Sequence, residues 1–114
     1  MSSIQYKELL SFTKNVLKKV NLDNFSSEAV SIGLSEASLR GVDSHGIRLL
    51  PHYVQSSLSG RKNPKPNFKI SSKFPASISL DADNAFGLSA GFKSIDEGIK
   101  AAKKYGITQV NVFN

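Results

Sequence analysis

Residues 40–53 read Arg-Gly-Val-Asp-Ser-His-Gly-Ile-Arg-Leu-Leu-Pro-His-Tyr, and they separate two stretches with helical periodicity. Glycines at positions 41 and 46 permit backbone conformations that other residues avoid, so this segment is predicted to turn. A turn so rich in polar side chains can present them to a cleft. We therefore expect the segment to divide two helices and to carry the chemistry of the chain.

Two helices are predicted before or at this turn. Across residues 4–20 apolar side chains recur near the 3.6-residue period, with lysines between them. Residues 21–24 are typical of a turn, after which Ser26 or Ser27 can cap a second helix that Gly41 ends.

A third helix is predicted from about Ile47 to Leu58. Pro51 is compatible with it only in the first turn, where a missing N–H costs nothing. Gly60 is a suitable left-handed residue after its end.

Beyond residue 60 the apolar period changes to two. Phe68 and Ile70 alternate with polar neighbours, and so do Ile78 and Leu80, which predicts a short pair of strands. The chain is thus expected to change from helical to sheet structure here.

A turn at residues 81–84 leads into one more helix, closed by Gly106, and a last strand over residues 107–113. The expected class is α+β, or mixed α/β, with helices first and then strand, strand, helix and strand. The apolar face of the helix consists of Leu88, Phe92, Ile95, Ile99 and Ala102.

Two regions are expected: a helical segment over residues 1–60, which holds the Ser-His-Gly motif, and the start of a mixed α/β domain over residues 61–114. The last strand reaches the terminus with no polar tail, so we expect the domain to be truncated there.

Composition favours an ordinary globular protein, with 39% apolar and 21% charged residues. No apolar run is long enough for a bilayer, and no membrane partner is expected. Cysteine is absent and the first residues lack the layout of a secretory signal, so we expect a cytoplasmic protein.

The net charge of +6 has a local origin in the basic residues between positions 61 and 73. Few aromatic residues are interleaved with them, so a nucleic-acid surface is disfavoured. A noncatalytic module that binds acidic partners through this loop is the alternative function; it predicts salt-sensitive binding and indifference to His45. The residues concerned are Arg61, Lys62, Lys65, Lys69 and Lys73.

The candidate catalytic residues are His45 and Ser44. An imidazole near a helix start can exchange a proton with a hydroxyl or carbonyl group near neutral pH, and Ser44 can cap that helix. The alternative is a simple cap beside a surface or half-buried histidine. A hydrolase triad is disfavoured, because adjacent side chains seldom meet in that geometry, and a metal site lacks ligand spacing with His52.

The candidate substrate-binding residues are Arg48 and Tyr53. Arg48 can hold a carboxylate by paired hydrogen bonds, on the same face as His45 if the intervening turn is helical. Tyr53 can offer its phenol to the same cleft.

No dinucleotide or phosphate loop of the Gly-x-Gly-x-x-Gly or Walker type follows a predicted strand. Gly87, Gly91 and Gly98 are instead expected to permit close helix packing.

The segment RGVDSHGIRLLPHYV resembles the signature of the malate/L-lactate dehydrogenase family, and residues 74–112 resemble the family's next strand, Asp-x-x-Asn-x-x-Gly turn, helix and strand. The resemblance implies a non-Rossmann fold and hydride transfer between NAD or NADP and a small 2-hydroxy or 2-oxo acid such as malate or lactate. It also implies a homodimer, and cofactor-binding residues beyond Asn114, so this portion alone should be inactive.

By the same resemblance His45 takes the place of the proton donor or acceptor, Ser44 that of its hydrogen-bonding neighbour, and Arg48 or the next residue that of the group near the substrate carboxylate. The chain departs from many relatives in one respect. They have arginine four residues after the histidine, where this chain has Leu49.

Overall fold

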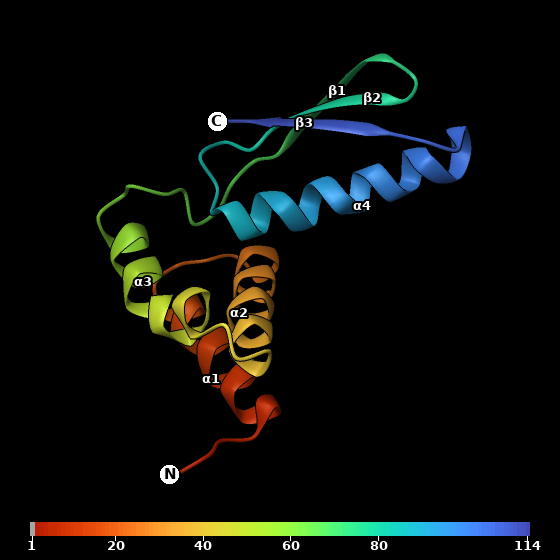
Figure 1. Cartoon of the computed structure of the whole chain (residues 1–114). Coiled ribbons are helices and arrows are strands. Elements are labelled where there is room, and N and C mark those ends of the chain that lie inside the picture. The colour runs from red at the N-terminus through yellow and green to blue at the C-terminus, as the bar shows by residue number, and fades with distance from the viewer. Residues whose placement is uncertain (1) are drawn as a thin grey trace. The chain divides into compact units, whose positions relative to one another are not determined.

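The computed structural model describes residues 2–114, which form two compact units, one ending at Lys65 and one comprising Pro66–Asn114. Their elements confirm the predicted α+β class (Figure 1). The first unit holds α1 (Tyr6–Lys19), α2 (Asn24–Leu39), two short 3-10 turns, η1 (Asp43–His45) and η2 (Ile47–Leu49), and α3 (Leu50–Leu58); the second holds β1 (Lys69–Phe74), β2 (Ser77–Asp81), α4 (Gly87–Tyr105) and β3 (Gln109–Phe113).

The core of the first unit lies between amphipathic helices. Leu17 on α1 and Val30 and Leu34 on α2 are fully buried. The Ser57 hydroxyl donates a 2.6 Å hydrogen bond to the carbonyl oxygen of Val20, which ties α3 to the end of α1. Burial of these aliphatic side chains is the main stabilising contribution to the unit.

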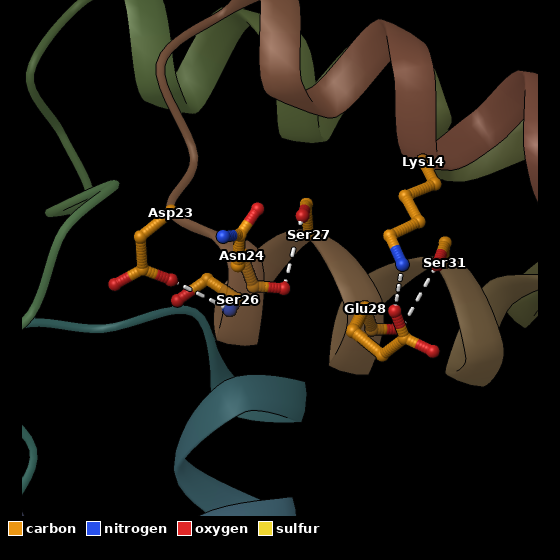
Figure 2. Close-up of polar contacts among 7 residues, drawn as sticks. All are labelled: Lys14, Asp23, Asn24, Ser26, Ser27, Glu28 and Ser31. Carbon is orange, nitrogen blue, oxygen red and sulfur yellow. Dashed lines mark hydrogen bonds and ion pairs between the residues drawn. The ribbon is translucent and has the colours of Figure 1, made fainter.

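Helix α2 begins earlier than predicted, and its cap is Asp23 rather than Ser26 or Ser27. A carboxylate oxygen of Asp23 accepts a 2.7 Å hydrogen bond from the backbone N–H of Ser26 (Figure 2). Both serines lie inside the helix and are buried, and the Ser27 hydroxyl donates to the carbonyl oxygen of Asn24. All three residues are of types that can cap a helix, and the first in the chain does so here.

We expect Asp23→Ala to lower the free energy of unfolding by about 1 kcal/mol, because the N–H of Ser26 loses its acceptor at a helix start. Chemical denaturation of the variant measures this loss. Asp23→Asn is the matched control, since an amide oxygen can also accept the bond. Equal loss in both variants would contradict the capping role.

Glycines end two of the helices of the first unit, as predicted. Gly41 after α2 and Gly60 after α3 have φ angles of 75° and 72°. Pro51 lies in the first turn of α3, where the sequence requires it. In the described residues no helix is both long and apolar enough to cross a membrane.

The second unit contains a three-stranded sheet in the order β1-β2-β3. Strands β1 and β2 pair antiparallel, which confirms the predicted strand pair. Strand β3 pairs parallel to β2, with Ile78 opposite Val110 and Leu80 opposite Val112. Ile78 and Leu80 point into the unit and are buried, whereas every residue of β1 is exposed.

Helix α4 connects β2 to β3 and ends at Gly106, whose φ is 83°. Gly98 confirms the expected close packing, since a Cβ atom there would lie 3.2 Å from a methyl carbon of Val110; at Gly87 and Gly91 nothing lies within 4 Å, so that expectation is wrong for them. The predicted apolar face is largely open, with Ile95 62% and Ile99 49% exposed.

On α4, the carboxylate of Glu97 accepts hydrogen bonds from the ammonium groups of Lys100, at 2.8 Å, and Lys93, at 3.0 Å. These two contacts hold the pKa of Glu97 below its usual value, with the Lys100 bond the larger cause. The ionised form is therefore favoured in the folded state.

This arrangement predicts a pH-dependent contribution to stability. A lowered carboxyl pKa stabilises the fold above the pKa of the unfolded chain, and the contribution is lost as pH falls through the folded-state pKa. The melting temperature of Glu97→Gln should therefore be lower than that of the parent at pH 7, and the two should be equal near pH 3. Asp96→Asn, on the same helix, is the control; a Glu97→Gln difference that is constant with pH would refute the linkage.

Candidate active site

The His45 turn, defined here as residues 41–49, joins α2 to α3. Its two 3-10 turns, η1 and η2, are separated by Gly46, whose φ of −97° and ψ of −147° interrupt the helical path. The backbone N–H of His45 donates to the carbonyl oxygen of Val42, and the N–H of Gly46 donates to that of Asp43. These bonds form the tight turn that presents His45 at the surface.

Ser44 and His45 contact each other directly. The Ser44 hydroxyl oxygen lies 3.0 Å from Nδ1 of His45, and both residues are exposed. This corrects one expectation: Ser44 does not cap the following helix, because it lies inside η1. The contact uses Nδ1, whereas a serine hydrolase engages its serine through Nε2.

The contact determines what the ring can do. If Nδ1 carries the proton and donates to Ser44, Nε2 is left as an acceptor for a substrate hydroxyl. If the Ser44 hydroxyl donates instead, Nε2 carries the proton and can donate to a carbonyl oxygen. Ser44 can therefore stay hydrogen-bonded to Nδ1 in either neutral tautomer of the His45 ring. Among the described residues no carboxylate forms an ion pair with His45.

Gly46 is required by a close approach to α2. A Cβ atom at this position would lie 2.2 Å from the hydroxyl oxygen of Ser38 and 3.0 Å from its backbone nitrogen. The same Ser38 hydroxyl accepts a 2.8 Å hydrogen bond from the backbone N–H of Ile47. The end of α2 thus holds the turn at Gly46 and Ile47.

Arg48 and Tyr53 lie on different elements. Arg48 is exposed in η2, and because Gly46 interrupts the helical path, the condition for placing Arg48 on the same helical face as His45 is not met. Tyr53 is half-buried on α3, and burial raises the pKa of its phenol. Its ring meets that of His52 edge-on, with centroids 6.3 Å apart.

The sequence of residues 4–114 matches the family model described as malate/L-lactate dehydrogenase. The chain belongs to the malate/L-lactate dehydrogenase family. It is 39% identical over 107 residues to a malate dehydrogenase of Pyrococcus abyssi and 34% identical over 100 residues to an L-sulfolactate dehydrogenase of Methanocaldococcus jannaschii. These matches cover 94% and 88% of this chain, but 30% and 29% of the two relatives.

Solved structures of this family have the same fold. The malate dehydrogenase of Pyrococcus horikoshii superposes with a TM-score of 0.91 at 32% identity, over 99% of this chain and 33% of that one. The sulfolactate dehydrogenase of Methanocaldococcus jannaschii gives 0.89 at 30% identity, over 96% of this chain and 32% of that one. The chain therefore spans about a third of the length of these family members.

Sequence reasoning missed Ser38, which anchors the His45 turn of this family member. Ser38 lies near the end of α2, and nothing in its neighbourhood in the sequence marks it as the partner of Gly46 and Ile47. From the sequence Gly46 is explained by its backbone freedom, whereas its φ of −97° is not positive and the structure explains the glycine by the lack of space beside Ser38.

We predict that Gly46→Ala destabilises the protein by roughly 1–3 kcal/mol, because the new methyl group overlaps the Ser38 hydroxyl and approaches the backbone. Gly91→Ala is the control. It adds the same methyl group in a helix with nothing within 4 Å and should be neutral or stabilising by up to about 1 kcal/mol. Equal free energies of unfolding for the two variants would show that Ser38 moves aside without a loss of stability.

Proposed function

We propose that the protein is an oxidoreductase that interconverts small 2-hydroxy and 2-oxo acids with NAD or NADP, and that His45 transfers the proton. The observation that carries the proposal is the exposed Ser44–His45 pair, with 3.0 Å between hydroxyl oxygen and Nδ1. It lies within a chain whose family consists of dehydrogenases. Family membership favours this function over a basic binding module.

In the oxidising direction, the proton of the substrate hydroxyl would pass to Nε2 of His45 while Nδ1–H donates to Ser44. In the reducing direction, the protonated ring would give the Nε2 proton to the carbonyl oxygen of the 2-oxo acid. Ser44 would act as a positioning residue that holds the ring plane, because its oxygen accepts from Nδ1–H in both the neutral and the protonated ring.

Arg48 and Tyr53 are the proposed substrate-binding residues. The exposed guanidinium of Arg48, one 3-10 turn beyond Gly46, would pair with the substrate carboxylate. The Tyr53 phenol, whose pKa is raised by burial, would serve as an uncharged hydrogen-bond donor.

The residues of this chain do not fit the phosphates of a dinucleotide cofactor at the β2–α4 turn. There the N–H of Asp83 donates to the carboxylate of Asp81, and the N–H of Asn67 donates to that of Asp83, so two carboxylates bring negative charge that would repel a phosphate. A nicotinamide cofactor, when bound, would carry the hydride. We assign its binding to residues beyond Asn114 and assign only the proton transfer to this chain.

A homodimer, as the family resemblance implies, and a cytoplasmic location, as the lack of cysteine favours, are part of the same proposal. Analytical ultracentrifugation of the protein encoded by the longest open reading frame that contains residues 1–114 should give twice the monomer mass.

The decisive experiment compares alanine variants of the two histidines of the chain, each made in the protein that this reading frame encodes. His45→Ala should lower turnover by about 10²- to 10⁴-fold with a panel of 2-oxo acids, because the proton transfer loses its donor. Nicotinamide absorbance reports the rate, and cofactor affinity should change little. His52→Ala, an exposed histidine on α3, should retain near-parent turnover.

Two results would argue against the assignment. One is near-normal turnover of His45→Ala; the other is an equal loss in His52→Ala.

A further inference from the structure

Ser38, near the end of α2, is bonded to the His45 turn at two places. Its carbonyl oxygen accepts a 3.0 Å hydrogen bond from the N–H of Gly41, where the turn begins. Its hydroxyl oxygen accepts a 2.8 Å hydrogen bond from the N–H of Ile47, directly beyond Gly46. One residue of α2 therefore closes the loop of residues 41–47, and His45 lies inside this loop.

The two bonds depend on different atoms. The bond from Gly41 is made to the backbone of position 38, as is usual where a helix ends, so it survives a change of side chain. The bond from Ile47 requires the serine hydroxyl, and it joins residues nine positions apart in the sequence. A single side-chain oxygen thus provides the hydrogen bond between α2 and the far end of the loop.

The Ile47 N–H lies between the two side chains that the proposed reaction needs. His45 comes two residues before Ile47, and Arg48 is the next residue. The side chain of Arg48 is long and has much rotational freedom, so its guanidinium can follow a substrate carboxylate when the backbone moves. The imidazole of His45 is attached by a short side chain, so its place depends closely on the backbone. Loss of the bond should therefore misplace His45 more than the guanidinium of Arg48.

We propose that Ser38 is a positioning residue for the proton transfer: its hydroxyl holds the loop so that Nε2 of His45 meets the substrate oxygen. This inference rests on the proposed function. Ser38 acts through the backbone of the turn and not by contact with the substrate. Because a displacement of a reacting group by about 1 Å can lower a rate about 100-fold, the hydroxyl is expected to affect turnover more than substrate binding.

The first test measures turnover with a panel of 2-oxo acids in the protein that the reading frame encodes. Ser38→Ala should lower kcat by about 10- to 100-fold and change KM by less than about threefold. Ser38→Thr keeps the hydroxyl and should restore most of kcat; its methyl group has room, because Ser38 lines a hollow of about 340 Å³ between α1, α2 and the turn.

Ser31→Ala is the matched control for this test. It removes another hydroxyl of α2, one that donates a 2.9 Å hydrogen bond to the carbonyl oxygen of Glu28 and does not reach the turn. It should keep the kcat of the parent, so a loss confined to Ser38→Ala is a property of position 38.

The second test does not use turnover. Amide hydrogen exchange, followed by NMR on protein made with isotope-labelled isoleucine and glycine, reports each of the two bonds separately. In Ser38→Ala the amide of Ile47 should exchange about 2- to 12-fold faster, which corresponds to one ordinary hydrogen bond. The amide of Gly41 should exchange as in the parent, because its acceptor is a backbone oxygen. Ser38→Thr should leave both amides protected.

Three results would overturn the positioning role while the proposed function stands. The first is a parent-like kcat in Ser38→Ala when His45→Ala is inactive. The second is an equal loss of kcat in Ser38→Ala and Ser38→Thr, which shows that the hydroxyl is not responsible. The third is a loss of kcat without faster exchange of Ile47, which shows that the bond to the turn is not responsible. If His45→Ala keeps its turnover, the proposed function fails, and the positioning role fails with it.

Discussion

The close approach of Gly46 to Ser38 is the constraint on which the candidate site depends. There is no room for a side chain at position 46, and the Ser38 hydroxyl holds the next N–H. The backbone directly after His45 is therefore fixed by the end of α2. A catalytic side chain on a short connection gains its orientation from such support, because the connection alone has few internal bonds.

The order of elements was predictable from the sequence because it rests on periodicity and on glycines. The change of apolar period after residue 60 separates helices from strands, and Gly41, Gly60 and Gly106 adopt the positive φ angles expected at helix ends. The cap of α2 was not predictable, because aspartate and serine are both common at helix starts. Which of Asp23, Ser26 and Ser27 caps the helix depends on where the backbone becomes helical, which the residue types do not decide. The Ser44–His45 contact and the anchor at Ser38 depend on side-chain rotation and on tertiary distance, which no local pattern encodes.

The parallel pairing of β2 with β3 has a consequence for the order of folding. Strand β1 meets β2 across a short turn, whereas Ser77 meets Gln109 only after the whole of α4 has intervened. Closing that longer loop loses more chain entropy than closing the β1–β2 turn, and the loss comes before any contact between β2 and β3 can stabilise the pair. The hairpin can form first as a local template, and docking of β3 with α4 becomes the slow, late step in assembling the sheet.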